Sequence, residues 1–180
     1  ITAGLGAPFA VAGHLALRPG GRLALVLPKA LLSGVAWGKT RTLLKDHYAL
    51  EWIIASHDPE RWNFSENTDL SEVLIVARRR EIGDKAAQPV VCINLWRNPK
   101  TSVEALAIAR RLANEKAPDL EQGQGSLDVY IGSEKFAEEM SVPWSKLRNV
   151  PWIAPCAFAQ GHLNRIAWRL LEHKQLNLPG

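Results

Sequence analysis

The chain has 180 residues, of which 47% are hydrophobic and 22% are charged, with 22 Lys+Arg against 18 Asp+Glu. This is the composition of a globular domain, and it excludes intrinsic disorder and low-complexity linkers as the main organisation. The length suits about one domain with an appendage. The net charge of +4 is compatible with an anionic partner but does not demonstrate one.

Two cysteines, Cys92 and Cys156, lie far apart and form no CxxC or CxxH spacing. This excludes a disulfide framework and a zinc ribbon, and it is compatible with a reducing cytoplasm. Glycines, a proline and a histidine interrupt the apolar stretch over residues 1–17, so it predicts neither a signal peptide nor a membrane span. We expect a cytoplasmic protein without a membrane partner. Because Ile1 opens a small-residue stretch, we also expect a longer parent protein.

Apolar runs separated by Gly and Pro predict the elements of the first half. In chain order we expect a helix over 8–17, a strand over 22–27, a helix over 39–47, and strands over 50–55, 70–77 and 90–96. The run over 22–27 is continuously apolar, which is typical of a strand buried on both faces in a parallel sheet.

The second half is more polar and less regular. We expect a helix capped by Thr101 or Ser102, a linker over 117–126, a short strand over 127–131, an irregular stretch over 142–155 and an amphipathic helix over 162–175. The pattern contains no internal repeat.

The order strand, helix, strand over residues 22–55 is typical of a βαβ unit. Residues 56–69 are too polar for a crossover helix, so the strands on either side of them are expected to form an antiparallel hairpin. The predicted fold class is therefore α/β: a partial doubly wound sheet, mostly parallel with a terminal antiparallel strand. A mixed extension follows it.

Three segments carry a family resemblance: LALRPGGRLALVLPKALLSG (15–34), LLKDHYALEWIIAS (43–56) and FSENTDLSEVLIVARR (64–79). In motif style and order they resemble the second half of the catalytic domain of S-adenosylmethionine-dependent DNA adenine-N6 methyltransferases, especially type I restriction modification subunits. The resemblance implies that residues 1–97 are the C-terminal half of a Rossmann-like methyltransferase domain. Residues 98–180 would then be a helical and irregular extension.

The implied reaction moves a methyl group from S-adenosylmethionine to a flipped adenine in a restriction–modification system. The family's glycine-rich cofactor loop and its Asn/Asp-Pro-Pro-aromatic motif are both absent. Gly4-Leu5-Gly6 does not replace the first, because no strand precedes it. We therefore expect this chain alone to be inactive, with S-adenosylmethionine bound mainly by an upstream half. DNA and a specificity or restriction subunit are the implied partners.

The resemblance also implies a base-binding residue. Extruding a base from the duplex costs a few kcal/mol, and base–aromatic stacking offsets about 1–3 kcal/mol of that cost. In the family, the loop before the last antiparallel strand supplies an aromatic side chain, and Phe64 occupies that place, with Asn67 nearby as a polar contact. Alternatively, Phe64 closes the loop onto the core. Trp62 is a second candidate for stacking.

Basic residues on the second predicted helix, Lys39, Arg41 and Lys45, are candidates for contacts with DNA phosphates, as is the run 78–80. The alternative is that they form a solvated face. We interpret Trp168 as a packing residue, whereas Trp144 and Trp152 could mark a contact with a partner or with the rest of the parent protein.

Two further classes of function stay open. The chain could be a non-catalytic DNA-binding or scaffolding module with a methyltransferase-like half-fold, or it could belong to a small-molecule or RNA methyltransferase. The adjacent pair His57-Asp58 is not interpreted as a catalytic dyad, because neighbouring side chains generally point apart. A half-sheet would expose an edge, so self-association of the chain is also expected.

Overall fold

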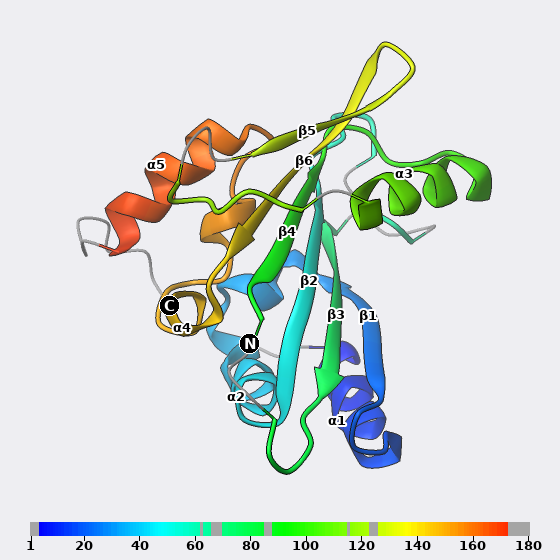
Figure 1. Cartoon of the computed structure of the whole chain (residues 1–180). Coiled ribbons are helices and arrows are strands. Elements are labelled where there is room, and N and C mark those ends of the chain that lie inside the picture. Colours follow the sequence, from blue (N-terminus) through cyan, green and yellow to red (C-terminus); the bar gives the residue numbers. More distant parts are fainter. Residues whose placement is uncertain are drawn as a thin grey trace.

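The computed structural model of the chain describes residues 4–61, 63–65, 70–84, 88–114, 116–122 and 126–172. A six-stranded mixed sheet forms the central layer, and helices pack on both of its faces (Figure 1). The fold class is therefore α/β. Among the described residues, no helix is both long enough and apolar enough to cross a membrane.

The strands are β1 (Arg22–Pro28), β2 (Tyr48–Ser56), β3 (Glu72–Arg79), β4 (Val90–Leu95), β5 (Leu127–Ile131) and β6 (Glu134–Val142). The α-helices are α1 (Gly6–Ala16), α2 (Gly38–His47), α3 (Ser102–Asn114), α4 (Trp144–Leu147) and α5 (Gly161–Glu172). Three 3-10 turns join them: η1 (Lys29–Leu32), η2 (Val35–Trp37) and η3 (Ala154–Cys156).

The sheet order is β1-β3-β2-β4-β6-β5, and the prediction of a mostly parallel sheet is wrong. Only β2 and β4 are neighbours in parallel; the other neighbouring pairs are antiparallel. The reason is that β3 turns back from β2 and inserts between β1 and β2. The β5–β6 hairpin then adds antiparallel to β4. The strands β1 and β2 do run in the same direction, as a βαβ unit requires, but they are not neighbours.

Several local predictions are confirmed. The hairpin of β2 and β3 pairs Ile53 with Ile75. The predicted cap of α3 is Thr101, whose Oγ1 accepts a hydrogen bond from the backbone N of Glu104 at 3.2 Å. The prediction that β1 is buried on both faces is wrong: exposed and buried residues alternate along it, because it lies at an edge of the sheet. Strand β6 is not predicted, because its sequence contains three glutamates.

Two apolar clusters fill the space between the layers. The larger one joins one face of the sheet to α2, α4, α5 and the turns η1 and η3. The smaller one lies on the opposite face and joins β4, β5 and β6 to α3 through Ile108 and Leu112. Trp144 and Trp152 belong to the larger cluster and are 5% and 1% exposed, so the interpretation of these side chains as contacts with another part or partner is wrong.

The residues after 97 continue the same sheet. Strand β6 pairs with β4 in the register Cys92 to Met140, and Ser141 of β6 forms a further bridge with Asp119. The division into 1–97 and 98–180 therefore cuts through one hydrogen-bonded sheet. At the other edge, β1 has no outer neighbour among the described strands, and Phe9 and Leu15 of α1 are exposed. Self-association stays a prediction.

Candidate functional site

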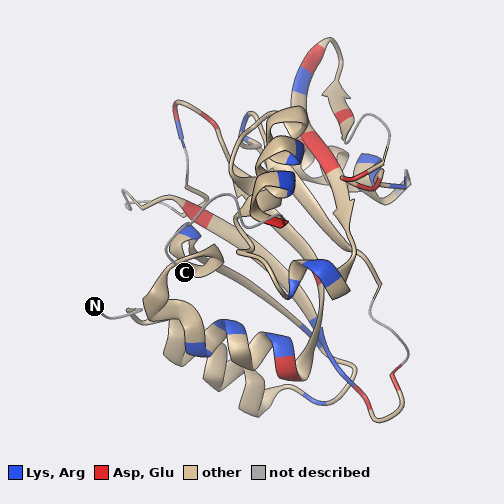
Figure 2. Ribbon diagram, turned by 90° about the vertical axis from the view of Figure 1, so that its left-hand side faces the viewer, with Lys and Arg blue, Asp and Glu red and all other residues tan. Residues whose placement is uncertain are grey.

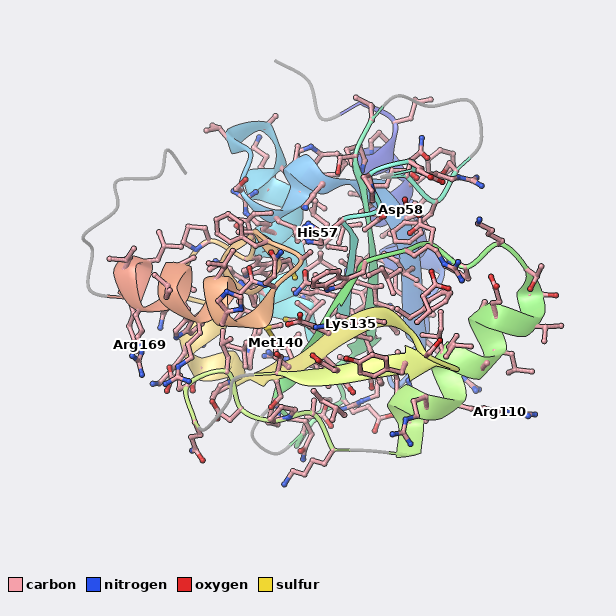
Figure 3. The ribbon with its side chains drawn as sticks, turned by 90° about the horizontal axis from the view of Figure 1, so that it is seen from above. His57, Asp58, Arg110, Lys135, Met140 and Arg169 are labelled. Carbon is pink, nitrogen blue, oxygen red and sulfur yellow. The ribbon has the colours of Figure 1, made fainter. Side chains whose placement is uncertain are left out.

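Four strands of the sheet end on the same side: β5 runs in the same direction as β4, because both are antiparallel to β6, and β1 and β2 share this direction. Because β1 and β2 are both antiparallel to β3, and β4 is parallel to β2, the carboxyl ends of β1, β2 and β4 form one rim, at the top of Figure 1. Lys29 follows β1, His57 follows β2 and Trp96 follows β4. Figure 3 looks down on the sheet from this side. Ligands of open α/β sheets bind beyond the carboxyl ends of the strands, so this rim is the candidate site.

A buried carboxylate organises the loop that leaves β2. Asp58 is 7% exposed, and its Oδ1 accepts hydrogen bonds from the backbone N of Glu60 at 2.9 Å and of Arg61 at 3.3 Å. Its Oδ2 accepts a third from the backbone N of Asn98 at 2.9 Å. Asp58 thus ties the loop after β2 to the loop after β4, and no hydrogen bond between Asp58 and His57 is present.

Two more buried side chains hold the same loop on either side of Phe64. The amide Nδ2 of Asn98 donates to the carbonyl oxygens of Arg61 at 2.7 Å and of Asn63 at 2.8 Å. On the other side, Glu72 Oε2 accepts hydrogen bonds from the backbone N of Phe64 and of Ser65, both at 2.8 Å. The backbone that carries the Phe64 ring is therefore fixed by hydrogen bonds from β3 and from the loop after β4.

Phe64 itself is half-buried. Its ring packs against the smaller apolar cluster, which includes Ile93 and Leu95 of β4. The ring is thus anchored on the core, as the alternative interpretation of this residue expects, and the residue is not fully buried, so base stacking stays a prediction. Asn67 and Trp62 lie outside the described residues.

His57 is held as a neutral hydrogen-bond donor. Its Nε2 lies 3.0 Å from Asn94 Oδ1, and Asn94 Nδ2 donates to the carbonyl oxygen of Pro155 at 3.0 Å. Because the amide nitrogen faces Pro155, the oxygen faces the ring, so the proton is on Nε2. Burial, and then the positive charge of Lys29, lower the pKa of His57 to about 4. Burial also lowers the pKa of Lys29.

This lowered pKa makes stability depend on pH. Between pH 6.5 and about 4, the unfolded chain binds a proton that the folded chain excludes, so stability is expected to fall as the pH is lowered through this window. A shift of this size corresponds to at most about 3 kcal/mol. Urea unfolding at pH 7.0 and pH 4.5 measures it. The His57→Gln variant should show a smaller difference between the two pH values, and an equal difference would contradict this assignment.

The predicted phosphate-binding residues lie on the other side of the sheet. Helix α2, with Lys39 and Arg41, packs on the larger cluster, whereas Phe64 packs on the smaller one. Arg41 Nη1 donates to the carbonyl oxygens of Leu31 at 2.9 Å and of Gly34 at 2.8 Å, which closes the loop of η1 and η2. Lys39 is exposed at the start of α2. The structure therefore does not gather these candidates around one point.

The run of three arginines is mostly engaged within the fold. Arg79 Nη1 donates to the carbonyl oxygens of His14 and Leu17 and so closes the end of α1. Arg78 pairs with Asp84 at 3.1 Å. A phosphate would have to compete with these internal partners.

The role of Asp58, Asn98 and Glu72 in fixing the Phe64 loop is not predicted from the sequence. Asp58 and Asn98 both precede a proline, a signal typical of turns, and their pairing joins positions 40 residues apart. The glycines near the start of the chain also have a local explanation. A Cβ atom on Gly6 would lie 2.8 Å from Leu27 Cδ2 and from Trp37, so this glycine permits close packing of α1 on the sheet.

The comparisons add no relative: no family model matches the chain, and no curated protein is detectably similar to it. Among the described residues, no cluster of His, Cys, Asp and Glu is suited to hold a metal ion.

Proposed function

We propose that this chain is part of an S-adenosylmethionine-dependent DNA adenine-N6 methyltransferase of a restriction–modification system. In this proposal it supplies the aromatic side chain on which the extruded target base stacks. The observation that carries the proposal is the placement of Phe64. Its half-buried ring lies on the loop between β2 and β3, and the backbone of that loop is fixed by Glu72 and Asn98.

A fixed ring suits the binding of an extruded base. The extruded base loses its stacking neighbours in the duplex. Stacking on an aromatic ring in the pocket compensates with about 1–3 kcal/mol of favourable free energy. A loop that is already held in place loses little conformational entropy when the base arrives, so more of the stacking energy remains for flipping. The three buried side chains Asp58, Asn98 and Glu72 provide this preorganisation.

The strand connections support the same proposal. The crossover from β1 through α2 to β2, followed by the hairpin of β2 and β3, occupies the segments that carry the family resemblance. The strands β4, β5 and β6 follow these segments in the sequence and lie outside them.

The described residues of this chain do not fit the methyl donor. A cofactor loop needs glycines between a strand and a helix, whereas the glycines before α1 follow no described strand, and Gly6 is used for packing. We therefore assign S-adenosylmethionine and the groups that bind the adenine amine to a part of the protein outside this sequence. On this proposal the isolated chain does not methylate DNA.

The test is the Phe64→Ala variant of the complete gene product that contains this sequence. Losing the stacking surface is expected to lower kcat/KM for methyl transfer to a target duplex about 10- to 100-fold. With 2-aminopurine at the target position, the fluorescence change on binding should also differ from that of the wild type. The Phe64→Tyr variant keeps a ring and should restore most of the activity.

The matched control is Tyr130→Ala, which removes a half-exposed ring from β5 and should leave both measurements unchanged. Wild-type turnover and fluorescence in Phe64→Ala would refute the stacking role. A complete gene product that binds DNA without methylating it would instead favour a non-catalytic DNA-binding module.

A further inference from the structure

A small cavity with three basic side chains lies between α2 and the chain segment after α4. Its volume is about 210 Å³, and Arg41, Lys45 and Arg148 line it together with Ser33, Asn149 and Trp152. Among the described residues, no carboxylate lines this cavity. Two of the cations come from α2, one turn apart, and the third comes from the turn that follows α4. Figure 2 shows the basic residues along α2.

The fold fixes two of these cations. The hydrogen bonds from Arg41 Nη1 to Leu31 and Gly34 hold its guanidinium against the loop of η1 and η2. Lys45 lies with its ammonium 5.9 Å from the centre of the Trp152 ring, and Trp152 is itself 1% exposed. Within the described residues these contacts use only Nη1 of Arg41, so the rest of the guanidinium keeps donors for a ligand.

The positive charges at the cavity repel one another. Burial, and then the charges of Arg41 and Arg148, lower the pKa of Lys45, while Asp46 acts in the opposite direction. The ion pairs between described residues include neither Lys45 nor Arg148. By contrast, Lys146 pairs with Glu121 at 2.6 Å, and Lys135 pairs with Glu138 at 2.6 Å.

We propose that this cavity binds a phosphate group. Arginine donates paired hydrogen bonds to phosphate oxygens, and lysine adds a compact positive charge. The hydroxyl of Ser33 is a neutral donor at the same cavity, and Asn149 Nδ2 has a second hydrogen beside the one that it donates to the carbonyl oxygen of Ser145 at 3.0 Å. A bound dianion would relieve the mutual repulsion of the three cations. The phosphate comes either from a nucleic-acid backbone or from a free phosphate or nucleotide. This site is independent of Phe64, because it opens between elements of the larger cluster.

Titration calorimetry with inorganic phosphate is the first measurement. The double variant Lys45→Gln/Arg148→Gln is expected to weaken binding at least tenfold. Arg41 is left intact, because its backbone contacts hold η1 and η2. The single variant Arg148→Gln changes an exposed side chain and should weaken binding without altering the thermal unfolding midpoint.

The matched control removes the same number of charges from an exposed surface: Lys100→Gln/Arg110→Gln, near and on α3. It should bind phosphate as the wild type does. Equal weakening in both double variants would show a general charge effect and overturn the proposal. The proposal would also be overturned if the wild type showed no detectable binding at phosphate concentrations of about tens of millimolar.

Duplex DNA at several salt concentrations distinguishes the two sources. If the cavity holds a backbone phosphate, the Lys45→Gln/Arg148→Gln variant should bind DNA more weakly, and the slope of log K against log salt should fall by about 1 to 2. If DNA binding is unchanged while phosphate binding is lost, the ligand is a free phosphate or nucleotide. Both results support a phosphate site.

Discussion

Replacing Trp168 with alanine is expected to lower the free energy of unfolding by about 4 kcal/mol. The indole is fully buried in the larger cluster, where it packs α5 onto the rest of the fold. Its Nε1 also donates to Glu121 Oε1 at 2.9 Å, and this carboxylate in turn binds Lys146. Alanine therefore leaves a large cavity and removes one of the donors to a partly buried charge.

Urea unfolding followed by circular dichroism measures this loss. Two further variants serve as comparisons for the loss of stability in Trp168→Ala. Trp168→Phe keeps most of the volume and loses the hydrogen bond, so about 1–2 kcal/mol is expected. Ile166→Ala changes a side chain of the same helix that is 54% exposed, and it should cost about 0.5 kcal/mol or less. If Trp168→Ala were as mild as Ile166→Ala, α5 would not be part of the cooperative core.

Removing the carboxylate of Glu138 is expected to cost about 3 kcal/mol. Glu138 lies in β6 and is 4% exposed. Its Oε1 contacts the Lys135 ammonium at 2.6 Å, and its Oε2 accepts hydrogen bonds from Ser126 Oγ at 3.0 Å and from the backbone N of Gly161. The Glu138→Ala variant leaves all three donors without this acceptor. It also removes a negative charge that lies beside the N-terminus of α5, where the helix dipole favours one.

The control lies in the same strand. Glu134→Ala removes a carboxylate that is 52% exposed and pairs with Arg97 at 2.9 Å, and a change of about 0.5 kcal/mol is expected. The free energy of unfolding of both variants should be measured at pH 7. Similar losses for the two glutamates would contradict the role of Glu138 as a buried anchor between β6 and α5.

Local structure could be predicted from the sequence to a large extent. The apolar runs over residues 22–27 and 50–55 are strands, and the helices α1 and α2 begin and end within a few residues of the predicted bounds. The direction of neighbouring strands could not be predicted, because an apolar run indicates burial and carries no information on which strand lies beside it. Strand β6 was missed for a related reason: Glu138 is typical of a solvated segment until its partners at positions 126 and 161 are known.

The candidate site was predictable only in outline. The position of Phe64 between two strands of a hairpin places it at the rim, and this follows from the sequence order. The contacts of Arg41 with two carbonyl groups could not be predicted from the sequence order, because they depend on the shape of a loop seven to ten residues away. The basic cavity could not be predicted from the sequence either, because Lys45 and Arg148 are about a hundred residues apart in it.

The insertion of β3 between β1 and β2 bears on how the chain reaches its native state. The hairpin of β2 and β3 needs to close only one loop. Strand β1 pairs with the other edge of β3, from which it is separated by about 50 residues in the sequence, so it can pair only after β3 is in place. Such a long closure is entropically slow, so the hairpin is expected to form the early nucleus and β1 to add late. Variants in β1 such as Leu23→Ala should therefore accelerate unfolding more than they slow refolding.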